Sequence, residues 1–531
     1  MQAWLSSSLV RHYPASRPRR RSALSLEAAR GEAVSFQVAF RTGEGDHRVT
    51  ASARAPEPLR VDIRRVGYVP VPHRSTLTDL AELDGGEHVP GLVPDPLFPE
   101  ATIHAGPFET NAFWITVRVP HDAPPGRRVV SVVLTEEDRP AIELTATVRV
   151  ARAVLGPRRG FPVTHWFYAD ALCDWYHTEV WQDSFWPILD RYLADVVAHG
   201  QDTILVPLFT PPTDGVKRPT QLLRIARQNE GYAFDWSLVR RWLRAARAAG
   251  LAYFEWPHFF TQWGAKNAVR VYEGHGEEAR LLWPPETPAT GQVYRDFLAQ
   301  LMPELERFLR SEGALDNSFF HVSDEPHGDE HLANYRAARQ VLRAVAPWMK
   351  VMDALSDIRL AREGLTDTPI PQIDVAPQFI REGYPAWTYF ACYPRGRYLN
   401  RHLDTPLIKI RMSGPLFYRT GVRGFLHWGY NYWYRSQTTT LIDPYHVVDA
   451  FAWPSWAPGD PYLVYPGEAG PVDSLRWEVF AESLQDYALL QTAGISPEDE
   501  ALAGIVDYAE FPRDPAWIRG LRRRALRAFG G

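Results

Sequence analysis

The chain has 531 residues, 45% of them hydrophobic and 23% charged, which is enough apolar material for at least two folded domains. The net charge of −5 gives no basic surface for nucleic acid or an anionic membrane. The sequence contains no run of about 18 uncharged apolar residues, so no membrane span is predicted. We therefore expect neither a nucleic-acid partner nor membrane insertion.

Cys173 and Cys392 are the two cysteines, too few for a disulfide framework or a cysteine-based zinc site. The arginine cluster at residues 17–21 lacks the apolar stretch of a secretion signal, because Glu27, Arg30 and Glu32 interrupt it. These observations favour a cytoplasmic location. The oligomeric state stays open.

The first part of the chain has the pattern of β-structure. Short alternating or apolar segments separated by glycine and proline occur at Ala33–Arg41, Phe113–Val119, Arg128–Leu134 and Ile142–Val150. No helical pattern lies between them, which is typical of an antiparallel β-sandwich. We expect this accessory domain over residues 1–155, with a linker at Gly156–Gly160.

From residue 160 to 531 the pattern changes to parallel β/α units. Amphipathic helical patterns such as Trp186–Ala198, Leu238–Ala249, Val293–Arg310 and Leu332–Ala346 separate many of the apolar runs. Eight runs suit a (β/α)8 TIM-like barrel, although seven or nine runs can also be counted, and Ser474–Thr492 reads as a closing helix with Ser474 as N-cap. The eight runs are Val163–Tyr168, Thr203–Phe209, Ala252–Phe259, Phe319–Ser323, Lys350–Ala354, Ile373–Pro377, Trp387–Tyr393 and Gly424–Tyr430.

Two adjacent carboxylates, Asp324 and Glu325, follow the fourth run and precede Pro326. Catalytic groups in such barrels lie just past the C-terminal ends of strands. Two close carboxylates repel each other's ionisation, which leaves one protonated as a general acid and the other charged. The alternative is that both merely stabilise the start of the next helix. The strand-end position favours a catalytic pair and hence a glycoside hydrolase.

A retaining glycosidase with a protein nucleophile needs a second carboxylate close to the acid, usually from another strand. The seventh and eighth runs contain none. Glu255, Asp353 and Asp374 remain as candidates on the third, fifth and sixth runs. If none of them serves, a 2-acetamido group of the substrate can act as the nucleophile.

Several spaced motifs closely resemble glycoside hydrolase family 123. They are Ser323–Pro326, Tyr393–Arg401 (YPRGRYLNR), Gly424–Trp433, Tyr465–Gly467 and Arg476–Tyr487. The resemblance covers roughly residues 160–490, and the first domain, including Gly31–Arg41, is similar to the companion domain of that family. The chain departs from the family pattern at Ala488, where an acidic residue is expected.

The resemblance implies a retaining β-N-acetylgalactosaminidase that works through an oxazolinium intermediate and needs no cofactor. Glu325 would protonate the leaving oxygen, and Asp324 would orient and stabilise the acetamido group. Aromatic side chains of the eighth strand would form the wall of the sugar subsite, with Asn431 as a hydroxyl partner. These aromatics are Trp428, Tyr430, Tyr432 and Trp433.

Further sugar-contacting candidates follow other strands. The chain is rich in tryptophan, tyrosine and phenylalanine, with 19, 23 and 25 residues, and aromatic faces suit the apolar faces of sugar rings. Trp256, His258 and Trp263 come with the third run, and His427 with the eighth. Tyr393 and Arg397 lie in the motif after the seventh, where a guanidinium could bind an anionic sugar.

Other interpretations remain open at this point. His327–His331 matches the H-x-x-E-H pattern of a zinc peptidase family, but Pro326 and Gly328 disfavour the helix that the pattern needs, so no metal is expected. A glycosidase for non-acetamido sugars with a carboxylate nucleophile is one alternative. A non-catalytic carbohydrate-binding protein is another, although binding alone gives no reason to hold two acids together.

Overall fold

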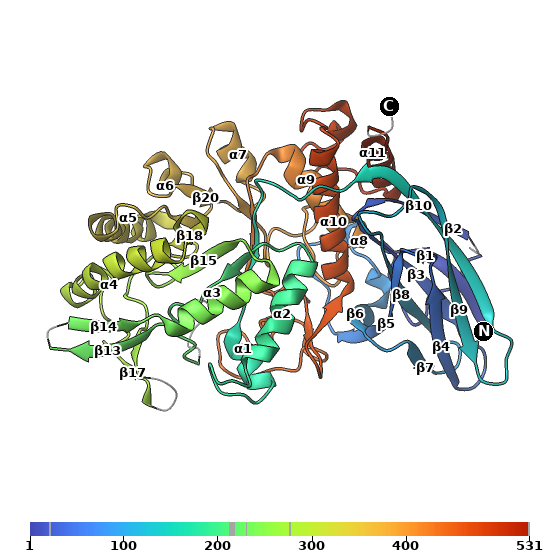
Figure 1. Cartoon of the computed structure of the whole chain (residues 1–531), viewed down its shortest axis with the longest axis horizontal. Coiled ribbons are helices and arrows are strands. Elements are labelled where there is room, and N and C mark those ends of the chain that lie inside the picture. The colour runs from blue at the N-terminus through green and yellow to red at the C-terminus, as the bar shows by residue number, and fades with distance from the viewer. Residues whose placement is uncertain (21–22, 212–217, 230, 275–277, 529–531) are drawn as a thin grey trace.

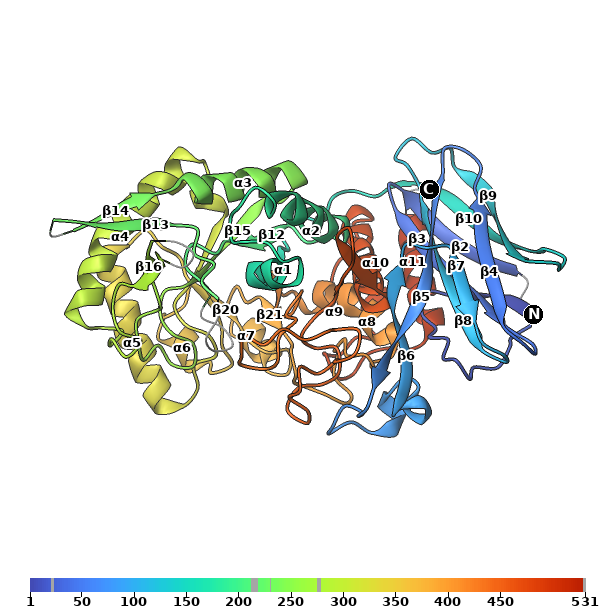
Figure 2. The same ribbon diagram turned by 90° about the horizontal axis from the view of Figure 1, so that it is seen from below.

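The structure is a computed structural model of the chain, described for all residues except 21–22, 212–217, 230, 275–277 and 529–531. Arg21 of the N-terminal arginine cluster therefore lies outside the described residues. Two parts lie side by side, a β-rich N-terminal part and a mixed C-terminal part, and helix α10 (Leu475–Thr492) runs between them (Figures 1 and 2). Among the described residues, no helix is long and apolar enough to cross a membrane.

The N-terminal part contains two β-sheets whose apolar residues pack into one core. One sheet has the order β1-β3-β8-β5-β6 before two later strands join it, and the other has the order β2-β10-β9-β4-β7. The bounds are β1 Gln2–Ser7, β2 Ala23–Arg30, β3 Ala33–Arg41, β4 His47–Arg54, β5 Arg60–Val71, β6 Gly91–Phe98, β7 Thr102–Ala105, β8 Thr110–Arg118, β9 Gly126–Glu136 and β10 Ile142–Val154.

All four strands predicted in this part are present, as β3, β8, β9 and β10. Their pairs are antiparallel, as expected, but β2 runs parallel to β10, with Thr145 opposite Ala23. The expectation of a purely antiparallel sandwich is therefore corrected at this one pair. Alternating burial along β10 places Leu144, Ala146 and Val148 in the core.

The C-terminal part contributes two strands to the first sheet. β24 (Pro471–Ser474) pairs with β6, and β23 (Tyr465–Pro466) pairs with β24. This pairing covers the edge of β6, which would otherwise leave its backbone groups unpaired. Arg476 adds a buried ion pair across the joint, with Nη2 at 3.0 Å from Asp95. Strand pairing and a buried ion pair therefore hold the two parts together.

In the described portion of the C-terminal part, eight short parallel strands organise the fold, and each lies beside the next in chain order. Backbone pairing joins β12, β15 and β18, then β19 with β20, and finally β21 with β22 and β11. Single bridges, Phe320–Val351 and Gln372–Tyr389, link these groups, and β11 contacts β12. The bounds are β11 Val163–His165, β12 Thr203–Leu205, β15 Tyr253–His258, β18 Ser318–His321, β19 Met352–Ala354, β20 Thr368–Ile370, β21 Thr388–Tyr389 and β22 Phe425–His427.

Six of the eight predicted runs contain an observed strand, and the fourth, Phe319–Ser323, overlaps β18. The sixth was misplaced, because β20 lies at Thr368–Ile370 whereas Ile373–Pro377 leads into helix α7 (Ala376–Arg381). Both stretches are short, apolar and interrupted by proline, so periodicity cannot separate them. Two small hairpins complete the strands, β13 Arg224–Gln228 with β14 Gly231–Asp235 and β16 Tyr272–Glu273 with β17 Arg280–Leu281.

The four predicted helices between strands are confirmed as α2, α3, α4 and α5, and Ser474 caps α10 by accepting a hydrogen bond from Trp477 N at 3.1 Å. Helices α2, α3, α4 and α5 cover the outside of the parallel strands (Figure 1). The remaining helix bounds are α1 Ala169–Trp175, α2 Trp186–Ala198, α3 Ser237–Ala249, α4 Gln292–Ser311, α5 Gly328–Val345, α6 Arg359–Arg362, α8 Leu407–Arg411, α9 Ser413–Thr420 and α11 Pro515–Arg527.

Candidate active site

A pocket of about 200 Å³ lies at the carboxyl ends of the parallel strands. Its lining residues end or follow seven of the eight strands, all except β12. This edge is where ligands bind in parallel α/β folds, because loops from separate strands converge there. The lining residues are Trp166, Gln262, Trp263, Asp324, Glu325, Ala354, Gln372, Tyr389, Ala391, Cys392, Tyr393, Leu426, Trp428, Gln437 and Trp456.

The backbone turns sharply at the acid pair. Glu325 has φ +43°, in the left-handed region that a non-glycine residue rarely adopts. Its N–H donates to Ala354 O at 2.9 Å, and Trp263 N donates to Asp324 O at 2.8 Å. Successive strand residues point to opposite faces, and this turn lets both carboxylates reach one pocket. The sequence expectation that the strand ends here is thus realised through a strained residue.

Tyr389, at the end of β21, holds the Glu325 carboxylate. Its hydroxyl donates to Glu325 Oε1 at 2.6 Å. Burial, together with the negative charges of Glu325 and Asp324, raises the pKa of Tyr389 well above its usual value. The phenol therefore stays protonated and remains a donor, which fixes the direction of the carboxylate. Asp324 is 8% exposed beside it.

A buried carboxylate, Asp460, supports the opposite wall. Its Oδ2 accepts hydrogen bonds from Trp428 Nε1 at 2.9 Å and from Cys392 Sγ at 3.1 Å. His427 and His402 lie 3.6 and 3.7 Å from its Oδ1. Burial opposes its charge, but interactions with these two histidines hold the pKa of Asp460 well below its usual range. The indole of Trp428 is thus oriented by a charged group that does not itself line the pocket.

The carboxylates considered as nucleophiles do not line this pocket. Glu255 and Asp353 are fully buried below it, with no side-chain exposure. Asp374 is exposed and lies outside the lining. Of the residues that line the pocket in the described part of the chain, Asp324 and Glu325 are the two carboxylates. Both come from one strand end, and no acid from a second strand is among the described lining residues.

Five of the sequence-predicted residues line the pocket, namely Asp324, Glu325, Trp263, Tyr393 and Trp428. Trp263 and Tyr393 are 43% and 41% exposed, so their rings are open to a ligand. Three further predicted residues lie directly behind the lining. Tyr432 packs on Trp428 and Trp456. His427 approaches Asp460, the carboxylate that binds Trp428, and His258 contacts the edge of Trp166 with ring centroids 5.6 Å apart.

The structure does not bring the other five predicted residues to the pocket. Four are buried, and each is held by a hydrogen bond elsewhere. Trp256 Nε1 donates to Ser318 Oγ at 2.9 Å, because strand alternation points this ring outward while Glu255 points inward. Tyr430 bonds to Asp195, Asn431 to the backbone of Tyr168, and Trp433 to Val464 O, while Arg397 is exposed at a separate surface hollow.

Sequence reasoning missed Tyr389, Trp166 and Trp456. Tyr389 ends the seventh strand, where the search for a nucleophile considered carboxylates alone. Trp166 follows the first strand and gave the same positional signal as Trp428. Trp456 comes from the long segment after β22, and no periodicity or motif marks it. The H-x-x-E-H pattern forms no metal-ligand group among the described residues.

A larger cavity of about 720 Å³ lies between the two parts, lined by residues of the first sheet, α2 and α10. Its acids already have partners. Glu478 and Asp473 pair with Arg64 at 2.5 Å each, and His199 lies between them and Asp195. This cavity therefore belongs to the interface between the two parts, whereas the smaller pocket is the candidate active site.

A family model described as glycoside hydrolase 123, catalytic domain, matches residues 166–493. The chain belongs to glycoside hydrolase family 123. The match spans every lining residue of the pocket, including Asp324 and Glu325. The comparison with curated proteins gave no match.

Among solved structures, the chain is similar to a family 123 glycoside hydrolase from Clostridium perfringens, described in connection with glycolipid glycan hydrolysis. The TM-score is 0.76 at 12% identity, over 100% of this chain and 98% of the other. At that identity the likeness establishes the fold. A GH2 β-galacturonidase from Eisenbergiella tayi gives a TM-score of 0.32 at 10% identity, over 91% and 96% of the two chains, which is too low to support an argument.

Proposed function

We propose that this family 123 member cleaves terminal β-linked 2-acetamido-2-deoxyhexosides, β-N-acetylgalactosaminides foremost, with retention of configuration. One observation carries the proposal. Among the described residues, the pocket lining holds two adjacent carboxylates from one strand end and no carboxylate from another strand. A general acid is thus available without a separate protein nucleophile, which is the situation that a substrate-assisted route requires.

In the proposed first step, the acetamido carbonyl oxygen attacks the anomeric carbon. The bond to the aglycone breaks as Glu325 gives its proton to the leaving oxygen. The nitrogen gains positive character in the oxazolinium ring, and the anionic Asp324 stabilises it. In the second step Glu325, now a carboxylate, takes a proton from water that attacks the same carbon. The ring opens, and the sugar leaves with its original configuration.

The pocket dimensions support a single terminal sugar. A volume of about 200 Å³ lies below the range of roughly 300–1,000 Å³ typical of sites for larger ligands. We propose that Trp263, Tyr393 and Trp428 form the walls against the apolar face of the ring. His258, His427 and Tyr432 act from behind, by fixing the wall residues in place.

Tyr389 is proposed as a positioning residue for the acid. Its hydroxyl bonds to the carboxylate oxygen Oε1 of Glu325, which leaves the other oxygen to face the substrate. When Glu325 is a carboxylate, this bond is charge-assisted and stronger than a neutral one. We expect it to keep Glu325 in one rotamer through both proton transfers.

We further propose that the eight parallel strands form a (β/α)8 barrel and that the domains span residues 1–155 and 160–531. Chain-order parallel pairing and the contact of β11 with β12 support the barrel. The end of β10 at Val154 and the start of β11 at Val163 support the division. The free thiols Cys173 and Cys392 support a reducing compartment, for which we propose the cytoplasm.

The test is hydrolysis of chromogenic β-GalNAc, β-GlcNAc and β-Gal glycosides by the wild type, Asp324→Asn and Glu325→Gln. Cleavage of the acetamido sugars alone, with rates at least about 10²-fold lower in both variants, is expected. The preferred epimer identifies the sugar. Turnover of β-Gal at a comparable rate would refute the substrate-assisted mechanism, and turnover of none of the three would refute this substrate class.

A further inference from the structure

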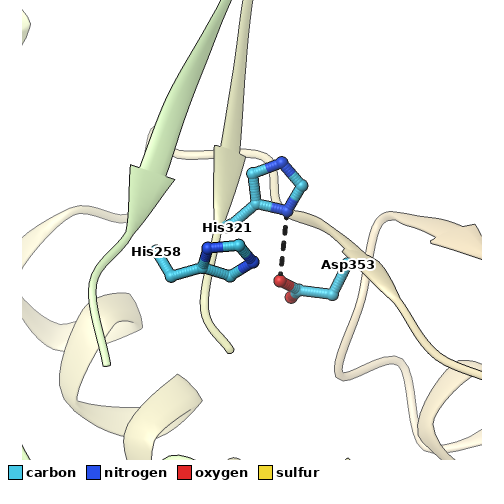
Figure 3. A group of neighbouring side chains, drawn as sticks. All are labelled: His258, His321 and Asp353. Carbon is cyan, nitrogen blue, oxygen red and sulfur yellow. Dashed lines mark ion pairs between the residues drawn. The ribbon is translucent and has the colours of Figure 1, made fainter. Parts of the chain in front are cut away.

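Three side chains meet in the interior below the pocket, His258 from β15, His321 from β18 and Asp353 from β19 (Figure 3). One ligand atom from each lies within 4.8 Å of the others, and all three residues are buried. None of the three lines the proposed catalytic pocket. The cluster is therefore a separate feature of the fold.

Two nitrogens in this cluster have no hydrogen-bond partner. His258 Nε2 and His321 Nδ1 are completely shielded and unsatisfied, although His321 Nδ1 lies 3.3 Å from Asp353 Oδ1. A buried polar atom without a partner costs about 1–3 kcal/mol. Two such atoms beside one carboxylate point to an occupant that accepts nitrogen and oxygen donors.

The surroundings orient the cluster as they do around a bound metal. His321 Nε2 lies 2.8 Å from Glu255 Oε1, so the carboxylate fixes the ring and leaves Nδ1 free. Histidine ligands in metal sites almost always use their second nitrogen in this way. Asp353 is fixed by Val322 N at 3.0 Å and by the Tyr335 hydroxyl.

The charges also favour a divalent cation. The groups that hydrogen-bond to Glu255 and Asp353 include Thr164, Trp166 and Tyr335, which are neutral, and His321. The cluster therefore combines two buried carboxyl groups with donors most of which are neutral. A divalent ion with neutral imidazole ligands balances both carboxylates.

We propose that His258 Nε2, His321 Nδ1 and Asp353 Oδ1 bind a divalent transition-metal ion, zinc in particular, at a structural site beneath the catalytic pocket. Imidazole with a carboxylate is a donor set that zinc accepts in tetrahedral geometry. The 3.3 Å separation of His321 Nδ1 and Asp353 Oδ1 matches an edge of a tetrahedron with ligand distances of about 2.0–2.1 Å. Glu255, bound to both His321 and Trp166, connects the site to the pocket wall.

The experiment is metal analysis of the full chain, purified without a polyhistidine tag and dialysed against metal-free buffer. Inductively coupled plasma mass spectrometry should find about one equivalent of zinc in the wild type, before or after incubation with zinc chloride. His258→Ala should lose it. Glu255→Gln should retain the ligands but bind zinc about 10–100-fold more weakly in competition with a chelating dye.

His12→Ala is the matched control. His12 is also 3% exposed and its Nε2 is also unsatisfied, but it lies in the N-terminal sheet region beside Trp4. This variant should keep the metal. Iron, cobalt or nickel at the same stoichiometry would equally support the site. A total content of these metals far below one equivalent in the incubated wild type, or a content unchanged in His258→Ala, would overturn the proposal. Because the wild-type measurement requires no variant to fold and no activity, it is independent of the proposed hydrolysis.

Discussion

The neighbouring strands β15, β18 and β19 carry two pairs of carboxylates, one pair past a strand end and one pair inside the strands. The surroundings of the two pairs differ completely. Asp324 and Glu325 follow the end of β18 and face a pocket. Glu255 and Asp353 lie inside β15 and β19 with no side-chain exposure. Glu325 has one neutral donor, Tyr389, whereas each interior acid contacts a histidine and several other donors.

The comparison shows that depth along a strand decides what an acid can do. An interior carboxylate must be paired, because removing it from water costs several kcal/mol. A carboxylate past the strand end can instead line a pocket that admits a substrate. Replacement of an acid that lines the pocket should therefore reduce activity, whereas replacement of an interior acid should reduce the free energy of unfolding.

The largest expected effect follows from replacement of Glu325 in the pocket. Glu325→Gln should lower kcat by about 10²–10⁴-fold without changing the unfolding free energy. The loss should be larger for an alkyl β-GalNAc glycoside than for a nitrophenyl one, because the poorer leaving group depends more on protonation. Glu382→Gln, an exposed acid paired with Arg362, is the control. Equal losses for both aglycones would argue against Glu325 as the acid.

The interior acid should behave in the opposite way. Asp353→Asn should lower the unfolding free energy by about 3–5 kcal/mol, because it leaves His321 beside fewer negative partners in a buried site. Urea titration followed by tryptophan fluorescence measures the change. Activity of the remaining folded protein should stay within a few-fold of the wild type. A stable Asp353→Asn enzyme with greatly reduced kcat would break the contrast between the two regions.

The link between Tyr389 and Glu325 sharpens the contrast from the substrate side. Tyr389→Phe removes one hydrogen bond to a charged group, worth about 1.5–3 kcal/mol, and should lower kcat roughly 10–100-fold. Because Tyr389 is placed as a positioning residue, KM should change much less. A change confined to KM would show that the phenol contacts the sugar instead.

The smallest expected effect is on the pH dependence of stability, and it comes from His12, a buried histidine. Burial, with a contribution from Arg19, lowers the pKa of His12 to about 4, below its unfolded value of about 6.5. The unfolded chain therefore binds more protons, and stability is lost as pH falls from about 6.5 to 4. Relative to His12→Gln, the wild type should lose about 2 kcal/mol between pH 7 and pH 5. Parallel urea curves for both proteins at both pH values test this, and an equal loss would contradict it.

Much of the fold followed from the sequence because local patterns and packing agree. Helix α2 and strand β3 have the predicted bounds, since amphipathic and alternating residues lie against a core that uses the same periods. Strands β23 and β24 were missed, because Pro471–Ser474 has no strand pattern of its own and pairs with a strand nearly 380 residues earlier. Long-range pairing of this kind leaves no local signal.

The site was predictable where position alone decides. Asp324 and Glu325 stood out because they follow a strand end. Trp256 and Tyr430 were misassigned, because whether a ring points inward or outward depends on a register that a single sequence fixes poorly. The cluster of His258, His321 and Asp353 joins three strands, so no spacing along the chain could reveal it.

The most direct test of the proposed chemistry uses a thiazoline analogue of N-acetylgalactosamine, which mimics the fused ring of the oxazolinium intermediate. Calorimetric titration of the wild type should show binding at least about 10²-fold tighter than that of N-acetylgalactosamine itself, as for an analogue of a high-energy state. Asp324→Asn should lose most of this advantage, because the charge facing the ring nitrogen is gone. Equal affinity for the analogue and the simple sugar, or an advantage that survives in Asp324→Asn, would contradict catalysis by Asp324 and Glu325 through the acetamido group.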